Sequence, residues 1–183
     1  MAGLKVLVVD DSSTNRQILQ VFLKRLGCQV VVAEDGQQAL ERFAAEAPDL
    51  VFMDVMMPVM DGYEATRRIK AMAADRWVPV VFLSALDKDQ NVVVGLEAGG
   101  DDYLPKPVNF VVLEAKFRAF ARSLLLRRSL DESRRRMHAI TDNIIDGIVT
   151  TDERAVIQSV NSSVLRLFGY QREEELLGRN VSV

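Results

Sequence analysis

The chain has 183 residues, of which 49% are apolar and 27% charged, and its formal net charge at pH 7 is −3. This length suits one ordinary domain followed by a second, partial one, and the apolar fraction is too high for a disordered chain. The acidic balance argues against nucleic-acid binding, and no run approaches the roughly 20 apolar residues of a membrane span.

The cellular compartment is predicted from two further features. The apolar run near the N-terminus, residues 6–9, is too short for a secretory signal peptide and leads directly into acidic residues. Cys28 is the only cysteine, so no internal disulfide can form. Both observations indicate a protein of the reducing cytoplasm.

Short apolar runs alternate with amphipathic helical segments from residue 4 to about residue 123. Such runs, when turn signals bound them, are typical of buried parallel strands. The first helical segment carries Ile18, Phe22 and Leu26 on one face, and Asp35 and Asp61 are suited to cap the next two helices. The predicted strands are 4–9, 29–33, 50–53, 78–83 and 102–104, and the predicted helices are 13–26, 35–45, 61–72, 88–98 and one that begins at 109.

Five consecutive strand–helix units predict an α/β fold with a doubly wound, five-stranded parallel sheet and right-handed crossovers. Polar residues stand at or just past the ends of four strands: Asp10 and Asp11, Asp54, Ser84 and Lys106. Because ligands bind outside the carboxyl ends of the strands in such sheets, we expect these side chains to converge. Three carboxylates, a hydroxyl and an ammonium describe a pocket for a divalent cation and a phosphoryl group.

The last predicted helix does not stop where the sheet domain should end. Its expected core face is followed, after a slip in phase, by apolar residues at alternating four- and three-residue steps, flanked by arginines. Two interpretations stay open, a solvated linker helix and a short coiled-coil seam that makes a homodimer through residues 126–144. The core face is Leu113, Phe117, Phe120 and Leu124; the seam is Leu126, Leu130, Ser133, Met137, Ile140 and Ile144.

After residue 144 the helical pattern of the sequence gives way to short strand-like segments. Segments 147–151 and 156–160 are strand-like with a turn at 152–154, Asn161 can cap a helix that runs to residue 168, and 172–177 favours a further short helix. About 40 residues is below the size at which a domain usually folds alone. We therefore expect a sheet domain at 1–123, a helical linker at 124–143 and a truncated second domain at 144–183.

The first part of the chain resembles the receiver domains of two-component response regulators. The resemblance rests on motifs that occur in order, each at a predicted strand end: Val8-Val9-Asp10-Asp11, Met53-Asp54 with Met57-Pro58 and Met60-Asp61-Gly62, Leu83-Ser84-Ala85, and Asp101-Asp102-Tyr103-Leu104 with Lys106-Pro107. It implies a flavodoxin-like sheet with strand order 2-1-3-4-5.

The resemblance also implies a role for each residue of the pocket. Asp54 is the implied phosphoacceptor. The implied magnesium ligands are Asp11, Asp54 and the backbone carbonyl of Met56, with Asp10 acting through water. Lys106 and Ser84 would contact the phosphoryl oxygens, and Tyr103 matches the aromatic residue of the family's switch.

The implied function is that of a switch and not of an enzyme. A sensor histidine kinase or a phosphotransfer protein would phosphorylate Asp54, and the helical linker would relay the event to an output beyond residue 183. Residues 140–183 are similar to the N-terminal part of a PAS sensory domain. That similarity rests on Asp146-Gly147-Ile148, Asn161-Ser162-Ser163, Leu167-Phe168-Gly169-Tyr170 and Leu176-Leu177-Gly178.

Two alternatives belong to other functional classes. A haloacid-dehalogenase-type phosphatase also uses an aspartate nucleophile and magnesium, but it needs two aspartates separated by one residue after the first strand. Asp10 and Asp11 are adjacent, and the best nucleophile, Asp54, follows the third predicted strand. The other alternative is an interaction module that dimerises without phosphorylation.

Overall fold

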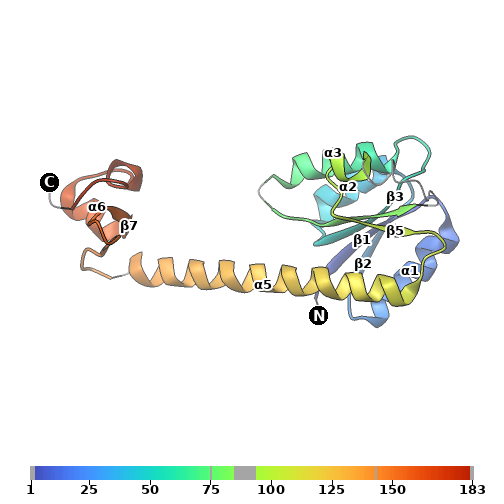
Figure 1. Ribbon diagram of the computed structural model, residues 1–183, viewed down its shortest axis with the longest axis horizontal. Helices are drawn as coiled ribbons and strands as arrows, with labels where there is room; N and C mark the ends of the chain where they lie inside the picture. The colour runs from blue at the N-terminus through green and yellow to red at the C-terminus, as the bar shows by residue number, and fades with distance from the viewer. Residues whose placement is uncertain (1–2, 75, 85–93, 143, 182–183) are drawn as a thin grey trace. The chain divides into compact units, whose positions relative to one another are not determined.

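The computed structural model describes residues 3–74, 76–84, 94–142 and 144–181, and the chain forms two compact units, Met1–Leu125 and Leu126–Val183. The first unit contains a five-stranded parallel sheet in the order β2-β1-β3-β4-β5, which confirms the predicted fold class and strand order (Figure 1). Its elements are β1 (Lys5–Val9), α1 (Ser13–Arg25), β2 (Gln29–Ala33), α2 (Gly36–Glu46), β3 (Leu50–Asp54), α3 (Gly62–Ala73), β4 (Val80–Ser84), β5 (Asp102–Pro105) and the first part of α5 (Phe110–Asp142), whose later residues belong to the second unit.

Side-chain caps fix the starts of the first three helices. The Ser12 hydroxyl accepts a hydrogen bond from the backbone N–H of Asn15 at the start of α1. Asp35 and Asp61 accept in the same way at the starts of α2 and α3, as the sequence predicts. Each cap satisfies a backbone donor that has no partner within its helix, so the helices begin at defined residues after the strands.

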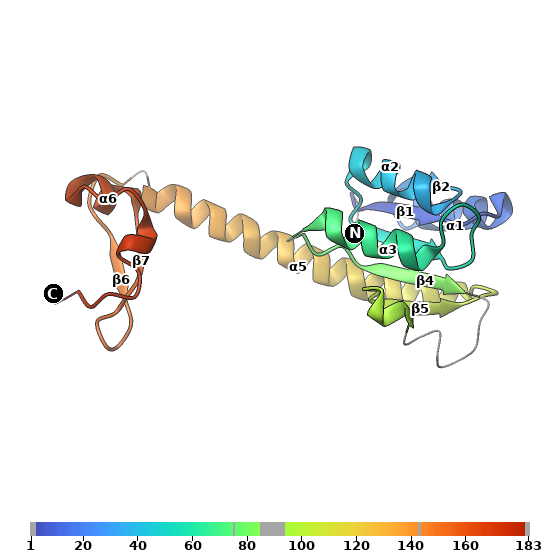
Figure 2. The same ribbon diagram turned by 90° about the horizontal axis from the view of Figure 1, so that it is seen from above.

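Helices cover both faces of the sheet. Figure 1 and Figure 2 place α2 and α3 on one face, and α1 and the first part of α5 on the other. The residues of β1 alternate between the two cores: Val6 and Val8 pack with α1 and α5, while Leu7 and Val9 pack with α2 and α3. This burial on both sides explains why the strands are continuously apolar and why polar residues appear only where they end.

Two predicted elements differ from the structure by more than one residue at an end within the first unit. The fourth strand begins at Val80 and not at residue 78, because Pro79 has no backbone N–H to donate to the ladder. Of the helix predicted at 88–98, residues 94–97 are helical, and its earlier part lies outside the described residues.

Helix α5 has a buried stretch followed by an exposed one. Leu113, Phe117, Ala121 and Leu124 are buried, whereas Phe120, predicted as a core residue, is only partly buried at the edge of the same cluster. Ala121 takes that place because a step of four residues returns to the buried face. Beyond residue 125 the apolar side chains of α5 whose burial the structure describes are exposed, with Leu126 at 60%, Leu130 at 70% and Met137 at 62%.

The second unit contains a small antiparallel pair of strands and a capped helix. Its elements are β6 (Val149–Thr151), β7 (Ile157–Val160), α6 (Ser162–Phe168) and the 3₁₀ turn η1 (Glu173–Glu175). The helix predicted at 172–177 is therefore a single 3₁₀ turn. Ile157, Val164 and Leu176 form a small core, and Asn161 caps α6 as predicted.

Asn161 also holds the end of α5. Its amide nitrogen donates to the backbone carbonyls of Thr141 at 2.8 Å and Asp146 at 3.0 Å, and its amide oxygen accepts from the backbone N–H groups of Ile148 and Val164. All the donor and acceptor positions of this buried amide are thus used. The side chain ties the linker helix to the folded segment that follows it.

No helix in the described part of the chain combines the length and the hydropathy needed to cross a lipid bilayer.

Candidate functional site

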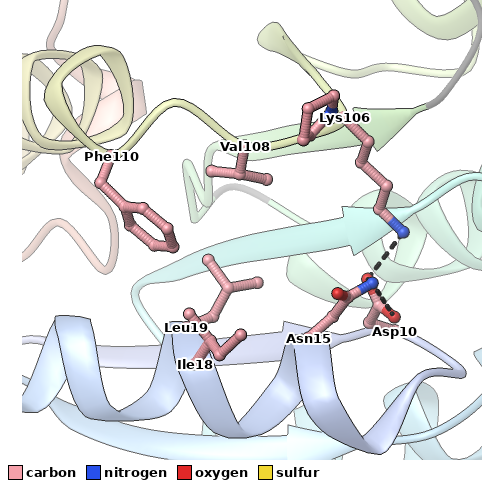
Figure 3. A pocket seen from close by; sticks show the side chains of 8 residues that line it. Asp10, Asn15, Ile18, Leu19, Lys106, Val108 and Phe110 are labelled. Atoms are coloured by element: carbon pink, nitrogen blue, oxygen red, sulfur yellow. Dashed lines mark hydrogen bonds and ion pairs between the residues drawn. The ribbon is translucent and has the colours of Figure 1, made fainter.

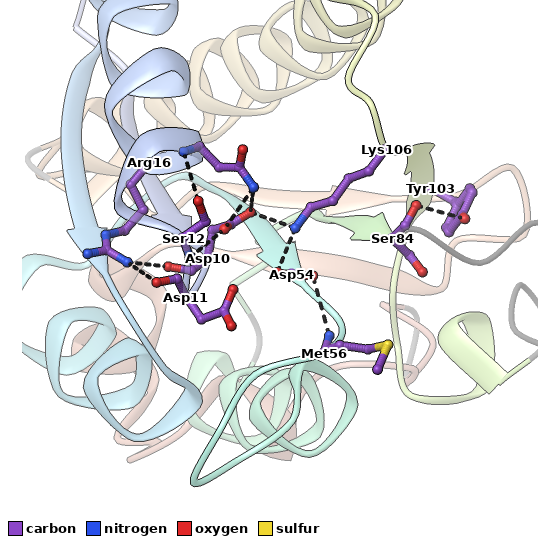
Figure 4. A network of polar contacts seen from close by, with 10 residues as sticks. Asp10, Asp11, Ser12, Arg16, Asp54, Met56, Ser84, Tyr103 and Lys106 are labelled. Atoms are coloured by element: carbon purple, nitrogen blue, oxygen red, sulfur yellow. Dashed lines mark hydrogen bonds and ion pairs between the residues drawn. The ribbon is translucent and has the colours of Figure 1, made fainter.

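The predicted site residues gather at the carboxyl edge of the sheet. Asp10 directly follows β1, Asp54 ends β3, Ser84 ends β4, and Lys106 follows Pro105, the last residue of β5. The parallel register pairs Asp54 with Leu83 and Ser84 with Pro105, so these strands end at the same level. Figure 4 shows the resulting group of side chains, which come from four separate segments of the sequence.

Lys106 joins two of the carboxylates. Its Nζ lies 2.6 Å from Asp54 Oδ2 and 2.7 Å from Asp10 Oδ2, and the lysine side chain is 20% exposed. Asp10 is fully buried and Asp54 almost so, whereas Asp11 is exposed. One ammonium therefore faces two buried carboxylates, and the exposed third acid stands at the rim.

The three carboxylates form a compact donor set. One oxygen each of Asp10, Asp11 and Asp54 can be chosen so that all lie within 4.8 Å of one another. Hard oxygen ligands at this spacing suit a small divalent cation such as Mg²⁺. With one ammonium against three carboxylates, the group keeps a negative formal charge that a cation would offset.

The site shifts two pKa values. Burial raises the pKa of the Asp54 carboxyl above its ordinary value, the charge of Asp10 adds to this, and the contacts from Lys106 and the Met56 N–H oppose it. Burial alone would lower the pKa of Lys106, but its hydrogen bonds and charge interactions with Asp10 and Asp54 outweigh burial and raise it. Lys106 therefore stays charged at neutral pH.

The segment after Asp54 approaches the site through its backbone. The Met56 N–H donates to Asp54 Oδ1 at 3.3 Å, while the Met56 side chain is exposed. The Gly62 N–H donates to the carbonyl of Val55, and a Cβ atom on Gly62 would lie 2.1 Å from the carbonyl oxygen of Asp54. Glycine at position 62 thus allows α3 to start directly against the acid.

Ser84 and Tyr103 lie on the other side of Lys106. Ser84 is buried, and its backbone carbonyl accepts hydrogen bonds from the Lys106 N–H at 2.8 Å and from the Tyr103 hydroxyl at 3.3 Å. Figure 4 shows the tyrosine ring beside Ser84. The backbone at the end of β4 therefore contacts both the lysine and the predicted switch aromatic, and a shift of Ser84 would reach both.

Two residues of α1 that are not among the predicted site residues also contact the acids. The Asn15 amide donates to Asp10 Oδ1 at 3.1 Å and Oδ2 at 3.3 Å, and Arg16 binds the backbone carbonyls of Asp10 and Asp11. Their signal in the sequence is their position in the first turns of the helix after the acidic pair. From there a side chain can reach back to the loop.

A cavity of about 240 Å³ opens beside the acids (Figure 3). Asp10, Asn15 and Lys106 supply its polar end, and α1 together with the segment after β5 supplies apolar walls that include Leu19, Val108 and Phe110. The cavity therefore borders the Asp10–Lys106 side of the site.

Comparison with known proteins identifies the class of this fold and site. The family model for the response regulator receiver domain matches residues 6–118, and the model for the PAS fold matches residues 135–183. The chain belongs to the response regulator receiver family, and a PAS segment follows the receiver domain.

Curated proteins with several different names are similar in sequence to this chain. The chain is 43% identical over 105 residues to protein PilG of Pseudomonas aeruginosa, covering 57% of this chain and 78% of that protein. It is 37% identical over 162 residues to the transcriptional regulatory protein AfsQ1 of Streptomyces coelicolor (88% and 65%), and 39% identical over 132 residues to the response regulator PleD of Caulobacter vibrioides (72% and 28%). The chain spans about half to two thirds of the length of the first curated relatives it matches.

Solved structures agree with this assignment. A two-component response regulator from Clostridium difficile has a TM-score of 0.62 at 30% identity, covering 65% of this chain and 96% of that one. The BeF3-activated N-terminal receiver domain of RstA from Klebsiella pneumoniae has a TM-score of 0.60 at 34% identity, covering 64% and 98%.

Proposed function

We propose that this protein is a phosphorylation switch whose Asp54 accepts a phosphoryl group from a sensor histidine kinase or a phosphotransfer protein. The observation that carries the proposal is Lys106 lying between Asp54 and Asp10 at the carboxyl edge of a receiver sheet. In the reaction an Asp54 oxygen attacks phosphorus and the P–N bond to the donor histidine breaks. The imidazole nitrogen keeps the electron pair of that bond and takes up a proton.

The surrounding residues have separate roles in the proposal. Asp11, Asp54 and the Met56 carbonyl would hold Mg²⁺ directly and Asp10 would do so through water, and the ion would supply charge neutralisation when bound. Lys106 pairs with the phosphoryl oxygens as a compact positive charge. The Ser84 hydroxyl donates to another phosphoryl oxygen. The close spacing of the carboxylates and the contact of Lys106 with two of them support the roles of the acids and of Lys106, and the roles of Met56 and Ser84 rest on the match to the receiver family.

The signal leaves the site through Ser84 and Tyr103. Movement of Ser84 towards the phosphoryl group would displace the carbonyl to which the Tyr103 hydroxyl donates, and Tyr103 would follow inward. We propose a receiver domain at 1–123, a relaying linker at 124–143 and a partial PAS domain at 144–183 that precedes the output. The proposal places the protein in the cytoplasm, where Cys28 stays reduced.

Acetyl phosphate with Mg²⁺ tests the phosphoacceptor. We expect one phosphoryl adduct in the intact mass of the wild type, and none in Asp54→Asn. Asp61→Asn is the matched control, because asparagine at this exposed position still caps α3 and should leave the adduct unchanged. An adduct that persists in Asp54→Asn would contradict the assignment. Multiple turnover of phosphate esters would support a phosphatase instead.

A homodimer through residues 126–144 is the second part of the proposal. Leu126, Leu130, Met137 and Ile140 recur at coiled-coil spacing and are exposed along α5. We expect sedimentation of the wild type to give a dimer that Leu130→Ser weakens. Val111→Ser, which also removes an exposed apolar side chain from α5, should leave it intact. A wild type that is monomeric both with and without Mg²⁺ and beryllofluoride would contradict the seam. A dimer whose stability does not change when Mg²⁺ and beryllofluoride are added would favour a phosphorylation-independent interaction module.

A further inference from the structure

Arg16 binds the backbone of the acidic pair. Its Nη1 donates to the carbonyl oxygen of Asp10 at 2.6 Å and to that of Asp11 at 3.0 Å, while its Nη2 lies 3.5 Å from Glu34 Oε2. The arginine side chain is only 17% exposed, so most of it is held against the protein. Figure 4 shows Arg16 and Lys106 on opposite sides of Asp10, with the two acidic residues between them.

The two acids are held in different ways. The Asp10 carboxylate has direct partners: the Ser12 N–H, the Asn15 amide and Lys106. Asp11 is exposed, and Arg16 binds its backbone carbonyl. One nitrogen that bridges two successive carbonyls fixes the orientation of the peptide between them. The direction in which the Asp11 side chain leaves the backbone therefore depends on Arg16.

We propose that Arg16 is a positioning residue for the cation site, which orients Asp11 by holding the carbonyls of both acids. The inference rests on the proposed Mg²⁺ site and adds a residue to it. The direction in which Mg²⁺ affinity changes when Arg16 is replaced distinguishes two roles for this residue. The positive charge of Arg16 opposes an approaching cation, so a purely electrostatic role predicts tighter Mg²⁺ binding when this charge is removed. A positioning role predicts weaker binding, because Asp11 would no longer be held near the other two carboxylates.

Calorimetric titration of the full chain with Mg²⁺ alone, at neutral pH, separates the two roles. The methionine of Arg16→Met has no hydrogen-bond donor in its side chain. We expect the dissociation constant of Mg²⁺ to rise by about tenfold in this variant, the usual scale for losing a group that orients a metal ligand. Arg16→Lys keeps the charge but has no planar fork to bridge two carbonyls, so we expect a smaller rise of about threefold. Arg25→Met removes an exposed arginine from the end of the same helix and should change nothing.

Each outcome decides between the possibilities. Tighter or unchanged binding in Arg16→Met, with the Trp77 fluorescence unfolding curve in EDTA unchanged, overturns the positioning role. A wild type that binds no Mg²⁺ overturns the proposed cation site itself. If Arg16→Met does not fold, Arg16→Lys and Glu34→Gln decide: Glu34→Gln leaves both carbonyl contacts in place and should bind Mg²⁺ like the wild type, whereas equal affinity in Arg16→Lys and the wild type overturns the inference.

Discussion

Buried polar side chains at the carboxyl edge of the receiver sheet and at the start of α6 in the C-terminal unit are used in opposite ways. In the receiver, Asp10 and Asp54 are buried carboxylates that share one ammonium, and a third acid stands beside them. In the C-terminal unit, Asn161 and Ser163 are buried neutral groups that donate to backbone carbonyls of residues 141–146, and Ser163 also accepts from the Arg166 side chain.

The difference separates a site that can change state from one that maintains a structure. A cluster of like charges stays responsive, because a cation, a proton or a phosphoryl group alters its balance. A neutral amide with all its hydrogen bonds made gains nothing from such a ligand and fixes the backbone around it. The charged cluster of the first unit can therefore respond to a ligand, and Asn161 holds the end of α5 against the segment that follows.

Replacing a glycine by alanine should give the largest difference in lost stability between the two units. In Gly62→Ala the new Cβ would meet the backbone carbonyl of Asp54, so α3 must shift, and we expect a loss of about 3 kcal/mol or more in the free energy of unfolding. In Gly147→Ala the new Cβ would lie 3.0 Å from Val164 Cγ2, 3.4 Å from Leu167 Cδ1 and 3.7 Å from Val164 Cα, so small shifts should relieve it and the cost should stay within about 1 kcal/mol. Urea unfolding monitored by Trp77 fluorescence measures the first, and hydrogen exchange of residues 144–170 measures the second. Equal losses of stability in Gly62→Ala and Gly147→Ala would contradict this difference between the units.

Asn161→Ala tests the structural role of the second unit. It removes two donors from the carbonyls of Thr141 and Asp146 and two acceptor contacts, so we expect a local loss of about 2 kcal/mol. Hydrogen exchange should rise at Ile148 and Val164 while the Trp77 unfolding curve is unchanged. Asn161→Asp keeps the acceptor but sets a buried carboxylate oxygen against the carbonyl oxygens of Thr141 and Asp146, so its exchange should rise at least as much as in Asn161→Ala. Protection equal to the wild type in both variants would show that the amide is dispensable.

The pH dependence of Mg²⁺ binding sharpens the account of the first unit. The folded-state pKa of Asp54 is raised, so a proton competes with the cation, and Mg²⁺ affinity should fall as the pH drops through this pKa. One competing proton gives at most about a tenfold loss per pH unit, or about 1.4 kcal/mol. Calorimetric titrations across a pH series measure it, and an affinity that does not fall as the pH drops would contradict competition between the proton of Asp54 and the cation.

The same raised pKa has a consequence for stability without the cation. Because the folded state binds the Asp54 proton more tightly than the unfolded chain does, ionisation of Asp54 lowers stability. The loss is absent below the unfolded pKa and is complete once the pH has risen past the folded pKa. Asp54→Asn should abolish this part of the pH profile, as measured by Trp77 fluorescence in EDTA.

The sequence alone predicts most of the helices and strands, and it shows that the site residues meet at the carboxyl edge of the sheet. Apolar runs that end in Asp10, Asp54 and Ser84 predict strands that stop at one edge, and Asp35 and Asp61 mark helix starts. These features are local, because periodicity and capping act over a few residues. The seam of α5 was equally visible as a pattern, and the structure adds that Leu130 and its neighbours are exposed.

Only the tertiary structure decided which atoms pair. Lys106 contacts Asp10 as well as Asp54, although these residues lie far apart in the sequence. Arg16 reaches back to two carbonyls, and Asn161 joins α5 to α6 through backbone groups. Backbone carbonyls are the same for every residue type, so no sequence pattern marks which of them a side chain will bind. Those contacts follow from the register of the strands and from the directions in which α1 and α6 leave them.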